Sequence, residues 1–212
     1  MVDLFLSAFV TLFVVIDPPG CAPIYAGLSA GASRRQAVTM AARACVVAAL
    51  ILVGFALFGK QLLGAIHVEL DAFRIAGGIM LFMIAVDMVF EKRTQRREER
   101  AEKIIAHNAE TIPEIEDVSI FPMAMPMLAG PGSIATIMLL MSRAHGFEQT
   151  VTVLAAMACV MTLSFASLAA AGPIMRVLGD KVEAVITRLL GVLLAALAAQ
   201  YVIDGVKTAL LS

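Results

Sequence analysis

The first apolar segment of the chain, residues 4–30, is interrupted by the sequence Asp17-Pro18-Pro19-Gly20-Cys21-Ala22-Pro23. Each proline lacks an amide proton and crowds the carbonyl four residues before it, whereas glycine leaves the backbone free. A regular helix is therefore broken at this stretch. We predict two half-helices that meet near Asp17.

A second apolar segment, residues 118–143, has a similar interruption at Leu128-Ala129-Gly130-Pro131-Gly132-Ser133. This sequence follows Ile16-Asp17-Pro18-Pro19-Gly20-Cys21 at a separation of 112 residues. Six of the eight prolines belong to the two segments, namely Pro18, Pro19, Pro23, Pro122, Pro126 and Pro131. Interrupted segments at matching places in two halves of a chain are typical of a transporter binding site.

The composition is that of a membrane protein, because 60% of the 212 residues are hydrophobic and the mean hydropathy is +0.91. A helix needs about 20 apolar residues to cross a bilayer. The apolar runs are continuous rather than alternating, which favours helices over a β-barrel. The predicted fold is an all-α membrane protein with six transmembrane helices, at residues 4–30, 37–59, 70–90, 118–143, 149–172 and 183–206.

The two halves repeat the same order of segments. Arg74-Ile75-Ala76-Gly77 is similar to Arg188-Leu189-Leu190-Gly191 at a separation of 114 residues, close to the 112 of the breaks. A unit of three spans enters the membrane from opposite sides in its two copies, so we predict an inverted repeat. The single transmembrane domain, 1–212, then divides into repeat one at 1–92, a charged cytoplasmic loop at 91–117 and repeat two at 118–212.

The start of the chain has no basic region and no cleavage site, so we expect its first span to be retained. Lys and Arg gather in the connections after spans one, three and five. The positive-inside rule places these connections in the cytoplasm and both termini outside it. Arg43, about two turns inside span two, is expected to reach back to the headgroups.

The sequence argues against several other classes of protein. The net charge of -1 disfavours nucleic acid as a partner. No metal-ligand spacing, phosphate loop or nucleophile and base pair is found, so we predict no metal, no cofactor, no catalytic residue and no enzyme activity. Repeated charged rings of the kind that line channels are absent from the sequence, and an oligomer is possible.

The chemical groups at the two breaks suit a particular kind of ligand. A half-helix that begins at Pro18 or near Gly130 presents backbone amides and a positive dipole end, which suit a carboxylate. Ser133 adds a hydroxyl, and the glycines let a ligand approach the backbone. For Asp17 three roles are open: it caps the half-helix, faces the ammonium group of a zwitterion, or takes up a coupling proton or cation. The second break has Ala129 at the matching position.

These segments resemble the MarC family of inner-membrane proteins. The resemblance rests on Asp17 to Gly20 with Pro23, on Phe121 to Ile134, and on the span from Arg188 to Gly205. It implies six helices, location in the bacterial inner membrane, and kinship with LysE-like exporters. From members assigned that activity, it also implies transport of small neutral amino acids such as glycine and alanine.

We therefore expect a secondary transporter that exposes one site to each side of the membrane in turn. The alternative is a non-transporting membrane protein, either an assembly partner or a protein associated with stress or antibiotic resistance. The expected partners are the lipid bilayer, a zwitterionic amino acid and a coupling ion. The predicted substrate-binding residues are Asp17, Pro18, Pro19, Gly20, Pro23, Ala129, Gly130, Pro131, Gly132 and Ser133.

Overall fold

The computed structural model describes residues 1–90 and 117–211, and these residues are helical apart from short turns. The first half contains α1 (Val2–Ile16), α2 (Pro18–Leu28), α3 (Arg34–Ala65) and α4 (Leu70–Val89). The second half contains η1 (Ser119–Leu128), α6 (Pro131–Arg143), α7 (Gly146–Ala169) and α8 (Ala171–Leu211).

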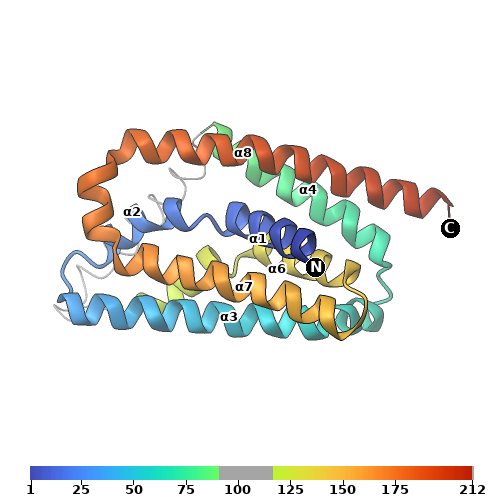
Figure 1. Cartoon of the computed structure of the whole chain (residues 1–212), viewed down its shortest axis with the longest axis horizontal. Helices are drawn as coiled ribbons and strands as arrows, with labels where there is room; N and C mark the ends of the chain where they lie inside the picture. The colour runs from blue at the N-terminus through green and yellow to red at the C-terminus, as the bar shows by residue number, and fades with distance from the viewer. Residues whose placement is uncertain (91–116, 212) are drawn as a thin grey trace.

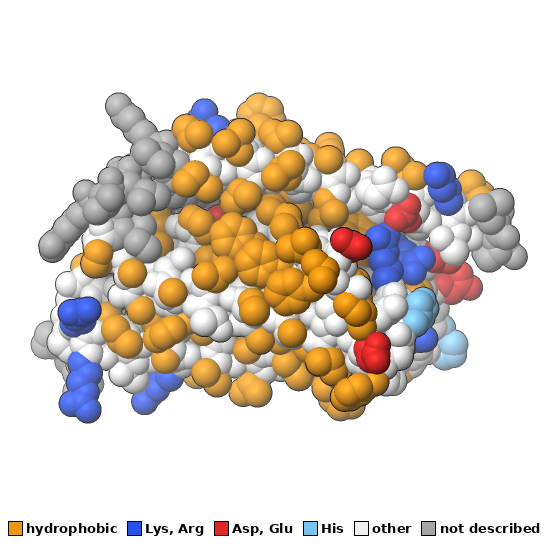
Figure 2. Space-filling model, viewed as in Figure 1, with side chains coloured by type: hydrophobic (Ala, Val, Ile, Leu, Met, Phe, Trp, Pro, Cys, Tyr) orange, Lys and Arg blue, Asp and Glu red, His pale blue; other side chains and the backbone are white. Residues whose placement is uncertain are grey.

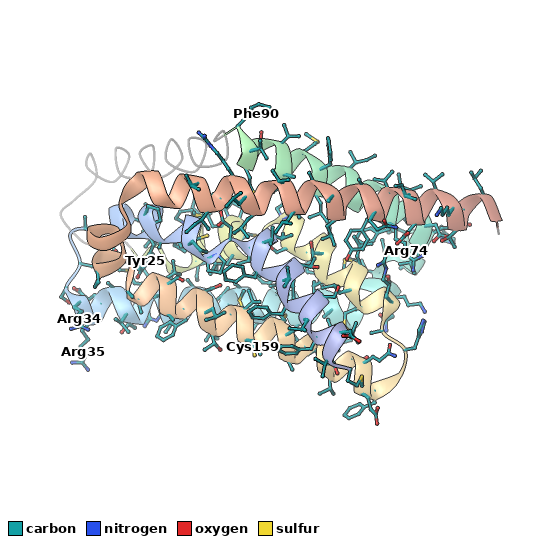
Figure 3. All side chains as sticks on the ribbon, turned by 45° about the horizontal axis from the view of Figure 1, so that its top comes forward. Tyr25, Arg34, Arg35, Arg74, Phe90 and Cys159 are labelled. Carbon is teal, nitrogen blue, oxygen red and sulfur yellow. The ribbon has the colours of Figure 1, made fainter. Side chains whose placement is uncertain are left out.

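The helices lie side by side along the length of the molecule (Figure 1). The chain passes along the bundle once in α1 and α2, then in α3, α4, η1 with α6, α7 and α8, and both termini lie at the same end (Figure 1). We call this the terminal end. At the other end lie the turns between α2 and α3 and between α7 and α8, and Figure 3 shows Arg34 and Arg35 there. We call it the Arg34 end.

The surface fits a membrane. Apolar side chains cover the middle of the molecule, and charged side chains gather toward its two ends (Figure 2). Among the described residues, five segments are long and apolar enough to cross a bilayer, and the bent pair of η1 and α6 is the sixth candidate. This agrees with the predicted all-helical membrane protein.

The bounds of the predicted spans differ most from those of the observed helices at the last span. We expected a span at 183–206 after a polar connection, but α8 begins at Ala171 and bends near its start (Figure 1). Likewise, α3 extends beyond the predicted 37–59 at both ends. Ser33 explains where α3 begins, because its hydroxyl and the Gln36 side chain form a reciprocal capping box.

The α4 and α8 helices form a close antiparallel pair. A Cβ on Gly78 would lie 2.9 Å from the Ala198 carbonyl oxygen, and one on Gly191 would lie 3.2 Å from that of Ala85. Further along, Gly205 faces the Asp71 carbonyl at 3.1 Å in the same way. Small residues allow helices to approach closely within a membrane. Gly78 thus allows close contact between α4 and α8, and Gly77 faces Leu139 of α6.

Arg43 has a specific partner. Its guanidinium forms an ion pair with Asp117 at 2.8 Å, which joins α3 to the start of η1 near the Arg34 end. The expectation of simple anchoring to headgroups is thus incomplete. The pKa of the Asp117 carboxyl lies below its usual value because the side chain and backbone amide of Ser119, together with Arg43, stabilise the charged form. Apart from Asp117, the predicted loop at 91–117 lies outside the described residues.

Candidate functional site

The first break consists of a single residue. Asp17 has left-handed backbone angles, φ 57° and ψ 64°, and it both ends α1 and begins α2. Its carboxylate accepts a hydrogen bond from the Gly20 amide at 3.2 Å, and the side chain is 1% exposed. The capping role considered for Asp17 is therefore confirmed. Asp and Asn are among the few residues that adopt this conformation and cap a helix at the same position.

The start of α2 does not offer the free amides that we expected. Pro18 and Pro19 have no amide proton, the Gly20 amide donates to Asp17 Oδ1, and the Cys21 amide donates to the Asp17 carbonyl at 3.1 Å. Asp17 and the prolines thus occupy or remove the donors of this helix end. What this break presents is a buried carboxylate beside the carbonyl end of α1, which carries partial negative charge.

The second break is longer and more irregular than predicted. We expected an interruption at Leu128 to Ser133, but the irregular backbone begins earlier, because η1 is a wide turn with extended backbone at Phe121 and Met125. The peptide bonds that precede Pro122 and Pro126 are cis. The axes of η1 and α6 are bent by 53°. Because the two prolines cannot donate backbone hydrogen bonds, the regular pattern of an α-helix is lost throughout this segment.

Helix α6 begins immediately after this bend. Pro131 occupies its first turn, and the Ile134 amide donates to the Gly130 carbonyl at 3.0 Å. The amides of Gly132 and Ser133 lie in the first turn, where a helix has no carbonyl of its own to accept them. Ser133 is 3% exposed, and Thr136, one turn later, donates to the Gly132 carbonyl at 2.7 Å. This break therefore presents donors.

The two breaks lie close to one another inside the bundle. A Cβ on Gly132 would lie 3.5 Å from Val15 Cγ1, and Val15 stands two residues before Asp17. The same Cβ would overlap Cδ1 of Ile84 on α4. The structure thus brings the end of α1, the start of α6 and Ile84 of α4 together.

The glycines serve the packing of the protein in this conformation. The space beside Gly20 is filled by the Asp17 carboxylate, that beside Gly130 by the Pro126 carbonyl, and that beside Gly132 by Ile84. We had assigned all three to close approach by a ligand. Only at Gly132 is the neighbour the flexible end of a side chain, so this is the position where the space can open.

The remaining predicted residues surround these two breaks. Pro18 and Ala129 are buried, Pro19 and Pro23 are half-buried, and Pro131 is exposed. Nothing in the sequence distinguishes Val15, Ile84 or Thr136, because they are ordinary members of apolar spans. Among the described residues, no group of three or more His, Cys, Asp or Glu side chains is arranged to hold a metal ion.

A cavity of about 680 Å³ opens at the Arg34 end. It is bounded by the end of α2, the start of α3 and the turn between α7 and α8, and its lining includes Tyr25, Ser29 and Arg34. Most of the other lining residues are alanines. Tyr25 stands two turns of α2 beyond Asp17, and its hydroxyl donates to the Ala37 carbonyl of α3. The buried residues Cys21 and Ala22 lie along α2 between this cavity and the break.

Comparison with known proteins agrees with the fold. Residues 2–210 match the MarC family integral membrane protein model. A UPF0056 membrane protein of Methanocaldococcus jannaschii is 32% identical over 207 residues, which cover 98% of each chain. A UPF0056 membrane protein of Aquifex aeolicus is 33% identical, with 98% of this chain and 94% of the relative covered.

A UPF0056 inner membrane protein of Escherichia coli is 28% identical over 203 residues, 95% of each chain. No solved structure matches the chain. The matches extend over both broken segments and all the helices between and after them. The chain therefore belongs to the MarC family of integral membrane proteins.

Proposed function

We propose that the protein is a secondary transporter that carries small neutral amino acids across the bacterial inner membrane by alternating access. The observation that carries the proposal is the meeting of two broken spans inside the bundle, through Val15 and Gly132. Irregular backbone at membrane depth is tolerated only where it is buried in protein or lines a cavity. Two such segments at one place are typical of a carrier site.

The chemistry of the two breaks favours a zwitterion. The first break contributes acceptors, the Asp17 carboxylate and the carbonyl end of α1, and the second contributes the amides at the start of α6 with the Ser133 hydroxyl. The ammonium group of an amino acid would face Asp17, and its carboxylate would face Gly132 and Ser133. Because Ile84 and Val15 fill the space beside Gly132, a ligand enters only when Ile84 moves, which favours a substrate with a small side chain.

The packing of the helices supports an inverted repeat. Each span contacts its counterpart in the other half: α1 contacts α6, α3 contacts α7, and α4 contacts α8. At residue level, Gly78 of α4 faces Ala198 and Val202 of α8, whereas Gly191 of α8 faces Ala85, Met88 and Val89 of α4. A separation of 113 residues, between the 112 and 114 of the sequence comparison, converts Gly78 to Gly191 and converts Ala198 and Val202 to Ala85 and Val89, so the two sets of contacts are equivalent at that separation.

The cavity beside Tyr25 is the access route from the Arg34 end in this proposal. The Arg34 guanidinium in the cavity lining would attract the substrate carboxylate, and the small alanine side chains leave space for a small molecule. The basic residues at this end favour the cytoplasmic side, with both termini outside. Alternating access then requires the bundle to open at the terminal end and close around Tyr25.

Ligand binding to the purified protein tests this proposal. A ligand that binds the folded state at 100 times its Kd stabilises it by about 2.7 kcal/mol. At 2–4 °C per kcal/mol, glycine and alanine should each raise the melting temperature by roughly 5–10 °C. Lysine and hydrophobic drugs should not. No shift with any small neutral amino acid, in protein that unfolds cooperatively, would overturn the proposed substrate class.

A further inference from the structure

At the terminal end, a single arginine joins two helices that do not pack along their lengths. Arg143, in the last turn of α6, forms an ion pair with Asp204 of α8 at 2.5 Å. Its guanidinium also lies over the ring of Tyr201, 4.7 Å from the centroid. The principal packing of α6 is instead with α3, α1 and α4. The side-chain bridge is therefore the main described link between the end of α6 and α8.

The partners of Arg143 are themselves held in place. The Gln200 side-chain amide donates to Asp204 Oδ1 at 2.6 Å, which orients the carboxylate, and Tyr201 is 3% exposed. Nearby, Arg74 pairs with Asp71 at 3.2 Å within α4, and Gly205 of α8 packs against both residues. Figure 3 shows Arg74 at the end of the bundle remote from Arg34 and Arg35. Arg143 thus attaches α6 to the closely packed pair of α4 and α8.

Helix α6 connects the second break to the Arg143 contact at the terminal end. The helix runs from Gly132, which faces Val15 and Ile84, to Arg143, so its two ends are the second break and the terminal end of the bundle. A movement that separates α6 from Ile84 at one end must act on the contact between Arg143 and Asp204 at the other. The Arg34 end, in contrast, contains the 680 Å³ cavity beside Tyr25.

We propose that Arg143, Asp204 and Tyr201 form a latch that closes the terminal end, and that release of this latch lets α6 move and exposes the breaks from that end. The inference rests on the proposed function, because a latch of this kind serves alternating access. An ion pair with partly exposed side chains is worth up to about 1 kcal/mol, or roughly fivefold in an opening equilibrium. Such a contact can form and release during a transport cycle.

Cys21 provides a native reporter of opening. Its thiol is fully buried, four residues after Asp17, and it donates to the Ile16 carbonyl at 3.6 Å. Replacing the other two cysteines, as Cys45→Ala and Cys159→Ala, leaves Cys21 as the single thiol. Labelling with a membrane-impermeant maleimide is measured in sealed vesicles in which the terminal end of the protein faces the added reagent. A C-terminal tag verifies this orientation. The assay requires no substrate.

Arg143→Gln and Asp204→Asn should each raise the rate of Cys21 labelling roughly fivefold. The charge exchange, Arg143→Asp with Asp204→Arg, should restore the slow rate. Lys207→Gln removes an exposed positive charge from the same end of α8 and should leave the rate unchanged. Melting temperatures of all variants identify any that fail to fold.

Unchanged labelling in folded Arg143→Gln and Asp204→Asn proteins would overturn the latch, as would an equal increase in Lys207→Gln. Protection of Cys21 by alanine is a separate measurement of the proposed function. If the rate of Cys21 labelling rises in Arg143→Gln and Asp204→Asn but alanine does not protect Cys21, the amino-acid site is contradicted and the latch is supported.

Discussion

Gly132 at the start of α6 faces Ile84 on α4 so closely that a Cβ on residue 132 would overlap Ile84 Cδ1. The contact joins the second break to the third span of the first half. Ile84 is half-buried and flexible at its end, whereas the neighbours of Gly20 and Gly130 are a capping carboxylate and a backbone carbonyl. Movement at the site is therefore easiest at this contact.

Gly132→Ala should destabilise the protein by about 1–3 kcal/mol, because an added methyl group overpacks the contact with Ile84. In the Ile84→Ala background, Gly132→Ala should cost much less stability, since the overlapping atom is absent. Thermal unfolding of both single variants and the double variant measures the coupling. Strictly additive effects would show that the two residues do not oppose each other.

Asp17→Asn should preserve the fold, because Asn also accepts the left-handed conformation and can cap α2. Asp17→Ala should cost about 2–3 kcal/mol, from the lost cap and the strained backbone, and lower the melting temperature by roughly 4–12 °C. If the carboxylate binds the substrate ammonium, the Asn variant should remain stable and lose amino-acid binding. Full binding by this variant would assign Asp17 to capping alone.

Gly78→Ala and Gly191→Ala should both weaken the α4 and α8 pair, because each added methyl group would meet a backbone carbonyl at 2.9 Å and 3.2 Å respectively. Gly54→Ala in α3 is the matched control, since its Cβ would have no neighbour within 4 Å. Alanine there should be neutral or stabilising by about 0.5–1 kcal/mol through its helix propensity. Equal destabilisation at all three positions would contradict the described packing.

Stability should depend on pH through Asp117. Its lowered pKa in the folded state means that the carboxylate contributes stability above the unfolded pKa of about 3.9, and that this contribution is lost as pH falls through the folded pKa. Asp117→Asn and Arg43→Gln should each lower the melting temperature at pH 7 by about 1–3 °C. As pH falls below the unfolded pKa of about 3.9, the difference between wild type and Asp117→Asn should shrink. A constant difference across this range would exclude titration of Asp117 as its cause.

The positions of the breaks could be predicted from the sequence because proline and glycine act locally. The sequence also shows that Pro18 and Pro19 lack amide donors. This is sufficient to exclude the start of α2 as a binding site for a carboxylate ligand. The contact between Gly132 and Ile84 was not readable, because Ile84 is one apolar residue among many in its span. Its importance depends on how α4 is rotated about its axis, which the hydrophobic pattern does not specify.

For the polar contacts, too, the sequence predicts one side chain of each pair but not its partner. Arg43 and Arg143 were recognisable as charges near span ends, but their partners Asp117 and Asp204 lie 74 and 61 residues away in the chain. Only the packed arrangement of the helices pairs them. In the same way, the sequence predicted an interruption at Leu128 to Ser133, and the combined effect of Pro122 and Pro126 on η1 became evident only in three dimensions.

The measurement that tests the central claim most directly is the uptake of radiolabelled alanine by proteoliposomes that contain the wild type, Asp17→Asn or Gly132→Ala. We expect saturable uptake by the wild type that excess glycine inhibits, and strongly reduced uptake by both variants at equal amounts of folded protein. Uptake by the wild type no greater than that of empty liposomes, for alanine and for every other small neutral amino acid, would contradict the assignment of a carrier site to the two breaks.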